Sequence, residues 1–281
     1  MSSGHWYPGS MSKAMNQLRE DLKAIDLVIE LLDARIPNSS RNPAFYDLFK
    51  NKKHLILLHK ADRAENKRTE AWLSYFNSMN AEVMAFSVQG KHYLDRLLRY
   101  FKKEEERISS GRFKRPLRMI FVGIPNVGKS TLINLFVRKA VTRTGNRPGI
   151  TRGKQWIRIM PNMELLDTPG ILRPKINEET VRSLAVVGAI PAGRADIYDA
   201  ALWLLSRYLE QEKLKYLQER YPGCESGPVE AIFEKIGFSQ GCLQSEGQID
   251  YERTAALILR DYQNGSLGKF TLEEAPPVDE F

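Results

Sequence analysis

Apolar residues along the chain occur in two alternating patterns. Short continuous apolar runs have the length of buried strands, and segments with apolar residues every three or four positions have the spacing of amphipathic helices. The expected strands are residues 27–32, 54–58, 83–86, 117–122, 155–160 and 163–166. The expected helices are residues 10–25, 66–79, 94–101 and 129–138. Repeated strand and helix units of this length predict a doubly wound α/β fold with a mainly parallel sheet covered on both faces.

The pattern changes in the last third of the chain. The strand signal fades beyond residue 178, and residues 195–221 are dense in Leu, Tyr and Trp at helical spacing. We therefore predict an α/β domain over residues 1–177, which begins with the amphipathic helix, and a smaller all-helical domain over residues 178–281.

Composition and charge narrow the class of protein. The 281 residues are 42% hydrophobic and 27% charged, as in ordinary globular proteins, and the net charge is +8. Residues 1–170 carry 30 Lys and Arg against 16 Asp and Glu. This excess favours a polyanionic partner for that part of the chain, although a solvated basic surface is the common alternative.

The sequence indicates no membrane span, no disulfide framework and no zinc site. No stretch approaches the roughly 18 consecutive apolar residues of a membrane span, and MSSGHWYPGS at the start lacks the apolar run of a signal peptide. We expect a cytoplasmic protein. Cys224 and Cys242 lie outside any zinc-ligand pattern, so buried thiols are expected.

The segment Gly123–Ser130, with the sequence GIPNVGKS, matches GxxxxGK[ST] between an expected strand and an expected helix. Its glycines allow backbone N–H groups to surround phosphate oxygens, Lys129 reaches the β and γ phosphates, and the Ser130 hydroxyl suits Mg²⁺. The nucleotide-binding residues predicted in and after this segment are Asn126, Val127, Gly128, Lys129, Ser130 and Thr131.

Two further segments complete the expected phosphate site. Asp167 follows the strand 163–166 and is placed to act on Mg²⁺, and the N–H of Gly170 can meet the γ-phosphate. Thr151 ends a loop rich in Gly and Pro and is expected to coordinate Mg²⁺ when the γ-phosphate is present. Taken alone, the first segment could be a simple turn and the second a connecting loop. After a P-loop, they favour a GTPase.

A guanine site needs a carboxylate that accepts from two N–H groups of the base, and nothing after residue 170 supplies the usual [NT]KxD pattern. The chain instead reads His59-Lys60-Ala61-Asp62 at the end of the strand 54–58, and Ser87 and Val88 end the next strand. The order of strands along a chain does not change which loops meet at the carboxyl edge of a sheet, so a permuted chain can still form one pocket. We expect Asp62 to set the guanine preference, with His59 donating to a ring nitrogen.

Several motifs together carry a family resemblance. They are Trp6-Tyr7-Pro8-Gly9, Asp33-Ala34-Arg35-Ile36-Pro37, Ser40-Arg41-Asn42-Pro43, GIPNVGKS, RPGIT over 147–151 and DTPG over 167–170. With the permuted order, they resemble the circularly permuted ribosome-biogenesis GTPases of the YlqF/RbgA type over nearly the whole chain. The resemblance implies a permuted Ras-like domain, a C-terminal helical domain that contacts ribosomal RNA, and a role in maturing the large (50S) ribosomal subunit.

The resemblance also implies roles and departures. The family usually has Asn in place of His59 and His in place of Ser10, and Ile171 fits the apolar residue that replaces a water-orienting Gln. Asn126 matches a P-loop asparagine that related GTPases associate with K⁺. The predicted catalytic residues are Lys129, Thr151, Gly170 and Asn126. The predicted metal ligands are Ser130, Thr151 and Asp167 for Mg²⁺ and Asn126 for K⁺.

The function predicted on this basis is a GTPase that binds GTP, GDP, Mg²⁺ and K⁺ and hydrolyses GTP slowly without the ribosome. Its expected partners are a large-subunit precursor and its rRNA, with no DNA, no membrane and a monomeric state. A metabolic P-loop kinase or ATPase is the first alternative, and DTPG and the KxD sequence argue against it. The second alternative is a catalytically weak, nucleotide-dependent RNA-binding scaffold.

Overall fold

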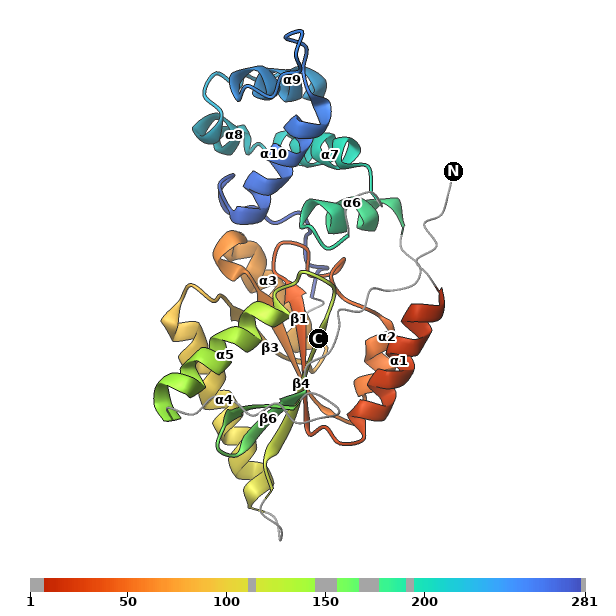
Figure 1. Cartoon of the computed structure of the whole chain (residues 1–281), viewed down its shortest axis with the longest axis vertical. Helices are drawn as coiled ribbons and strands as arrows, with labels where there is room; N and C mark the ends of the chain where they lie inside the picture. The colour runs from red at the N-terminus through yellow and green to blue at the C-terminus, as the bar shows by residue number, and fades with distance from the viewer. Residues whose placement is uncertain (1–7, 111–114, 145–155, 167–176, 191–194, 279–281) are drawn as a thin grey trace. The chain divides into compact units, whose positions relative to one another are not determined.

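The computed structural model describes residues 8–110, 115–144, 156–166, 177–190 and 195–278, and the chain divides into two compact units (Figure 1). The first unit is Met1–Lys175 together with Glu273–Phe281, and the second is Ile176–Leu272. The C-terminal segment is therefore grouped with the first unit, whereas the sequence analysis placed all of residues 178–281 in one domain.

The first unit is built on a six-stranded sheet with the strand order β3-β2-β1-β4-β6-β5. The strands are β1 (Leu27–Asp33), β2 (Lys53–His59), β3 (Glu82–Phe86), β4 (Leu117–Gly123), β5 (Trp156–Met160) and β6 (Met163–Leu166). All neighbouring strands are parallel except β5 and β6, which are antiparallel. The mainly parallel sheet predicted from the apolar runs is confirmed.

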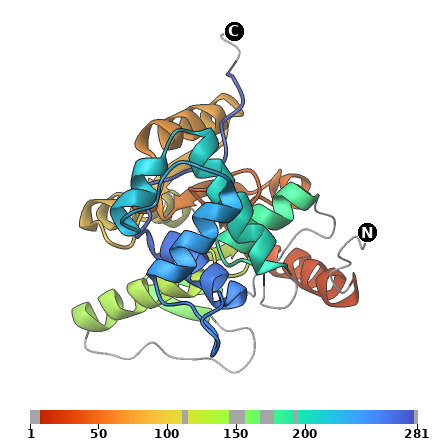
Figure 2. The same ribbon diagram turned by 90° about the horizontal axis from the view of Figure 1, so that it is seen from above.

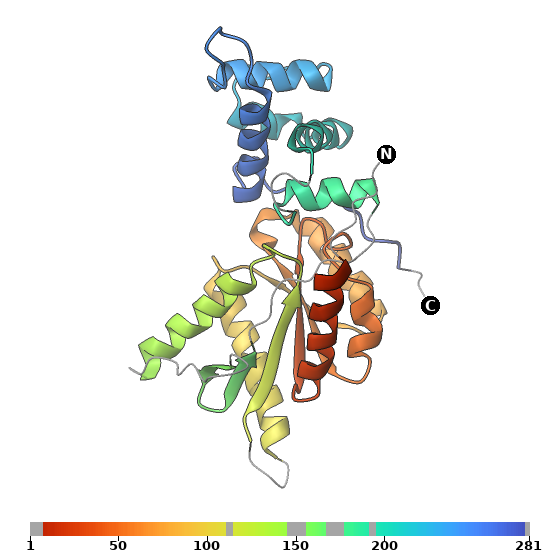
Figure 3. The ribbon, with the colours of Figure 1, turned by 45° about the vertical axis from the view of Figure 1, so that its right-hand side comes forward.

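Helices cover both faces of this sheet (Figure 1, Figure 3). They are α1 (Pro8–Leu22), α2 (Ala44–Phe49), the 3₁₀ turn η1 (Ala61–Arg63), α3 (Asn66–Ser78), α4 (Lys91–Ser109) and α5 (Lys129–Thr144). Val28 and Leu32 of β1 lie under α1, α2 and α3 on one face. On the other face, Phe136 of α5 contacts both Phe101 of α4 and Phe121 of β4. The doubly wound arrangement is therefore confirmed.

Helix α2 was not predicted from the sequence. It has six residues and follows Pro43, so it is too short to show a helical period over the window on which that pattern depends. Its two phenylalanines, Phe45 and Phe49, are buried against the sheet with α1.

In the second unit, the regular secondary structure of the described residues is helical, apart from an isolated bridge between Leu243 and Ile249. Its helices are α6 (Glu178–Val186), α7 (Ile197–Glu210), α8 (Leu214–Arg220), α9 (Val229–Ser239) and α10 (Tyr251–Asn264). α10 packs against both α7 and α9 (Figure 2). The segment 195–221 is two helices, because Glu212 adopts a left-handed conformation (φ 55°) between α7 and α8.

Local sequence fixes where three of these helices begin. The side chain of Asn177 accepts a hydrogen bond at the start of α6, Asp196 does so for α7, and Asp250 for α10. Such caps satisfy backbone N–H groups that have no partner within the helix. Within the described ranges, no helix is both long enough and apolar enough to cross a membrane.

Candidate nucleotide-binding site

The segments predicted to bind phosphate and base lie at one edge of the sheet. Gly123 ends β4, His59 ends β2, and Phe86 ends β3. These strands and β1 are parallel neighbours, so their carboxyl ends share one edge, which is where open α/β sheets bind ligands. We call residues 123–130 the P-loop and residues 59–62 the base loop.

The P-loop is closed around the side chain of Lys129. The ammonium group of this buried lysine donates hydrogen bonds to the carbonyl oxygens of Gly123 at 3.1 Å and Ile124 at 2.9 Å. Asn126 (φ 55°) and Gly128 (φ 113°) adopt positive φ angles, which bend the loop before α5 begins at Lys129. A bent, Gly-containing loop at a helix N-terminus presents backbone N–H groups to an anion.

Both P-loop glycines are required by close contacts. A Cβ atom on Gly123 would lie 2.6 Å from the carbonyl oxygen of Leu31, and one on Gly128 would lie 2.4 Å from Cε1 of His59. Real Cβ atoms essentially never come this close to a non-bonded atom, so neither position accepts a side chain without movement of its neighbour. The P-loop therefore lies directly against β1 and the base loop.

His59 contacts the P-loop through its ring. Its Nδ1–H donates to the carbonyl oxygen of Val127 at 2.8 Å, and the ring stacks on Phe86 with centroids 5.7 Å apart. Burial, followed by the nearby Lys60 charge, lowers the pKa of His59 to about 4, so the ring is neutral at pH 7. The Nε2 atom is buried and has no hydrogen-bond partner among the described residues.

Lys60 forms a second link between the base loop and the P-loop. Its ammonium group donates to Oδ2 of Asp33 at 2.9 Å and to the carbonyl oxygen of Asn126 at 3.3 Å. Its backbone is left-handed (φ 62°, ψ 32°), a conformation that is costly for residues other than glycine and that often marks functional sites. Burial lowers the pKa of Lys60, and the carboxylate of Asp33 opposes that shift.

Sequence reasoning missed the buried ion pair beneath these contacts. Asp33 and Arg35 are fully buried, and the Arg35 guanidinium donates to both carboxylate oxygens at 2.9 Å. The backbone N–H of Arg35 also donates to Oδ1 of Asp33 at 3.1 Å. Desolvation alone would raise the pKa of Asp33, but the charges and hydrogen bonds of Arg35 and Lys60 hold this pKa far below its usual range. The DARIP motif alone indicates a family signature and no ion pair with Lys60, because Lys60 lies directly after β2, far from the motif in the sequence.

The remaining predicted base residues lie at the ends of β2 and β3. Asp62 is half-buried in η1, with a carboxylate oxygen 3.6 Å from Nε of Arg63. Ser87 is buried and its hydroxyl accepts from the N–H of Gln89 at 3.1 Å, whereas Val88 is exposed. Ser130 and Thr131 are exposed in the first turn of α5. The structure thus brings the predicted base and P-loop segments together.

Four predicted residues of the γ-phosphate side, Thr151, Asp167, Gly170 and Ile171, lie outside the described residues. The side chain of Ser10 also lies outside them. Over the described ranges, no group of three or more His, Cys, Asp and Glu residues could hold a metal ion, and both cysteines are buried free thiols, as expected.

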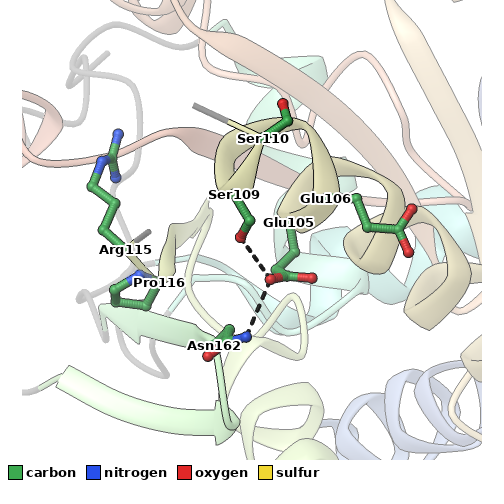
Figure 4. Close-up of a pocket in the computed structure, with 7 residues that line it drawn as sticks. All are labelled: Glu105, Glu106, Ser109, Ser110, Arg115, Pro116 and Asn162. Atoms are coloured by element: carbon green, nitrogen blue, oxygen red, sulfur yellow. Dashed lines mark hydrogen bonds between the residues drawn. The ribbon is translucent and has the colours of Figure 1, made fainter. Parts of the chain in front are cut away.

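A separate polar cavity of about 490 Å³ opens at the opposite edge of the sheet (Figure 4). It lies between the end of α4, the start of β4 and the β5–β6 turn, and its lining residues are Glu105, Glu106, Ser109, Ser110, Arg115, Pro116 and Asn162. Glu105 accepts hydrogen bonds there from the Ser109 hydroxyl at 2.8 Å and the Asn162 amide at 3.3 Å. None of the predicted site residues lines this cavity.

The fold and the two linked loops define a P-loop nucleotide-binding protein in which the base-side strands precede the phosphate-side strands. A family model described as "50S ribosome-binding GTPase" matches residues 118–228. "Ribosome biogenesis GTPase A" of Bacillus cereus is 42% identical, covering 95% of this chain and 93% of that protein. The protein of the same name from Thermotoga maritima is 32% identical, covering 97% of this chain and 95% of that protein.

The chain is also similar to solved structures of a GTPase. The GNP-bound YlqF from T. maritima has a TM-score of 0.66 and 28% identity, covering 95% of this chain and all of that chain. Its GDP-bound form has a TM-score of 0.64, covering 92% of this chain and 98% of that chain. The chain belongs to the ribosome biogenesis GTPase A family, as the motifs indicated. It is therefore a GTP-binding and GTP-hydrolysing enzyme.

Proposed function

We propose that this GTPase is an assembly factor for the large ribosomal subunit and that its GTP or GDP state controls docking on the precursor particle and its rRNA. The observation that carries the proposal is the pair of links between the base loop and the P-loop, from His59 to Val127 and from Lys60 to Asn126. They support one nucleotide pocket in a permuted chain. The names of the family model and of the relatives support the ribosomal partner.

In this proposal the nucleotide is held from two sides. Lys60, Asp62, Ser87 and Val88 surround the base, with His59 in the wall of the pocket. The phosphates are bound by the P-loop, where Lys129 exchanges its bonds to Gly123 and Ile124 for bonds to phosphate oxygens. The other phosphate-side residues are Asn126, Val127, Gly128, Ser130, Thr131, Thr151 and Gly170.

The donor set proposed for Mg²⁺ consists of the hydroxyls of Ser130 and Thr151 and the carboxylate of Asp167. Such oxygen donors fit Mg²⁺, and Ser130 is exposed on the first turn of α5, beside the P-loop. Asn126, also exposed in the P-loop, is the proposed K⁺ ligand. When bound, these cations neutralise the charge that develops between the β and γ phosphates.

The proposed ribosomal contact includes the basic segment 138–158, which begins within α5 and ends within β5. Its residues are Arg138, Lys139, Arg143, Arg147, Arg152, Lys154 and Arg158, with no acidic residue among them. Neutralising phosphates with such a segment makes binding steeply dependent on salt. Charge reversal at Arg143 and Lys154 should therefore weaken particle binding and reduce its salt dependence. We further propose that the protein is a cytoplasmic monomer.

Single-turnover GTP hydrolysis tests the enzymatic part of the proposal. It should be measured in K⁺ and in Na⁺, with and without large subunits, for the wild type, Asn126→Asp and Ser10→His. Because Ile171 cannot orient water and Ser10 is a poor base, we expect slow hydrolysis that large subunits and K⁺ accelerate. Fast hydrolysis in Na⁺ without subunits would contradict this, and binding of GTP without hydrolysis under any condition would favour the scaffold alternative.

A further inference from the structure

His59 occupies the space between the end of β2 and the P-loop. The residue is 3% exposed, and its ring lies against the backbone of Gly128 and stacks on Phe86 at an interplanar angle of 21°. No Cβ would fit on Gly128 while this ring is present. The imidazole is therefore a packed part of the pocket wall.

The hydrogen bond to the P-loop fixes which nitrogen of His59 carries the proton. A carbonyl oxygen only accepts, so the contact between Nδ1 and Val127 O requires a proton on Nδ1. A neutral imidazole then has a lone pair on Nε2 and no second N–H. A second proton on Nε2 would give the buried ring a positive charge beside Lys60. Burial and the charge of Lys60 disfavour that form, and they lower the pKa of the ring to about 4.

This tautomer has a consequence for recognition of the base. The N7 and O6 atoms on one edge of guanine are both acceptors, so a residue that reads N7 must donate a hydrogen bond. Nδ1 of His59 already donates to Val127, and Nε2 is covered by protein and offers only a lone pair. Neither nitrogen is a donor to the base.

We propose that His59 is a positioning residue that joins β2 to the P-loop, and that the pocket binds guanine nucleotides without reading N7. The inference rests on the proposed base site and refines its specificity, which falls on Asp62 and the donor edge of guanine. It replaces the expectation from the sequence that the imidazole donates to a ring nitrogen.

The test compares GDP with 7-deazaguanosine diphosphate, in which a C–H group replaces N7 and the donor edge is unchanged. Equilibrium dissociation constants for the wild-type chain should agree within about twofold, because no hydrogen bond is lost. His59→Asn supplies an amide with two N–H donors, one for Val127 and one for N7, and should prefer GDP about fivefold, as one neutral hydrogen bond allows.

A second measurement uses the wild type alone. In ¹⁵N-histidine spectra of the GDP-bound chain at pH 7, the His59 ring should be neutral with its proton on Nδ1. A proton on Nε2, or a wild-type preference of fivefold or more for GDP over the 7-deaza nucleotide, would overturn the inference while leaving the nucleotide site intact. Failure of the folded wild type to bind GDP would instead refute the proposed base site and this inference together.

Discussion

The ammonium group of Lys60 lies 2.9 Å from Oδ2 of Asp33, at the carboxyl ends of the neighbouring strands β1 and β2. The same carboxylate accepts hydrogen bonds from Nε and Nη2 of Arg35, and Lys60 also donates to the backbone carbonyl of Asn126 in the P-loop. The buried ion pair in the first unit is thereby connected to the nucleotide site. Asp33 serves to hold Lys60 where the base loop meets the P-loop.

Replacing Asp33 by Asn should destabilise the protein by about 3–5 kcal/mol, because it leaves the buried Arg35 guanidinium without its counter-charge. Urea unfolding of the nucleotide-free chain measures this. Glu20→Gln is the matched control: its partner Lys23 is exposed on the surface, so the loss should be below about 1 kcal/mol. Equal losses in the free energy of unfolding from the two variants would show that the buried Asp33 pair stabilises the protein no more than an exposed ion pair does.

The His59 ring should make stability depend on pH. The unfolded ring takes up a proton near pH 6.5, whereas the folded ring does so only near pH 4, so the unfolded state binds more protons between these values. Stability should therefore fall as the pH is lowered through this window, by up to about 3 kcal/mol from His59.

Chemical denaturation of the wild type and His59→Asn at pH 7, 5.5 and 4 isolates that contribution. The carboxylate of Asp33 also loses its stabilising effect at low pH, but it is present in both proteins and cancels in the difference. Parallel stability curves for the two proteins would mean that the folded ring titrates as freely as the unfolded one.

Gly128→Ala should abolish tight GDP binding. The new Cβ would be 2.4 Å from the His59 ring, and the backbone at φ 113° is unfavourable for alanine. Gly223→Ala is the control, because φ there is also positive (83°) but nothing lies within 4 Å of the added atom. That variant should lose about 1–2 kcal/mol of stability and bind GDP normally, as titration calorimetry can show. Normal GDP binding by Gly128→Ala would contradict the described packing of the P-loop on His59.

Asp62→Asn should exchange guanine preference for xanthine preference. A carboxylate pairs with the ring N–H and amine of guanine, and its loss in a site built for those contacts should cost about a hundredfold or more in affinity. Competition binding with GDP and XDP measures the exchange. Asp47→Asn, at an exposed position on α2, should leave the preference as in the wild type. An unchanged preference in Asp62→Asn would assign the base contact to another residue.

The parts of the site that could be predicted from sequence are local. The P-loop is a contiguous motif whose glycines, lysine and serine each have a physical requirement, and β4 and α5 flank it as the apolar pattern indicated. The short KxD pattern at the end of a strand indicates Asp62 as the base-reading carboxylate. The permuted order of the strands followed from the positions of these motifs along the chain.

The parts that could not be predicted depend on contacts between distant segments. Asp33 and Lys60 meet only because β1 and β2 are neighbours in register, with Asp33 opposite His59. The tautomer of His59 depends on the carbonyl of Val127, which belongs to the P-loop, 68 residues further along the chain. The carboxylate of Glu273 accepts from the backbone N–H groups of Asn38 and Ser39, and no periodicity or motif indicates a contact across so much of the chain.

Co-sedimentation with large-subunit precursor particles tests the proposed function most directly. The full chain is loaded either with GDP or with a non-hydrolysable GTP analogue and centrifuged with the particles at several salt concentrations. We expect the analogue-loaded protein to pellet with the particles, with binding that weakens as salt rises, and the GDP-loaded protein to remain in the supernatant. Equal binding of the two forms, or no binding of either, would contradict control of docking by the nucleotide.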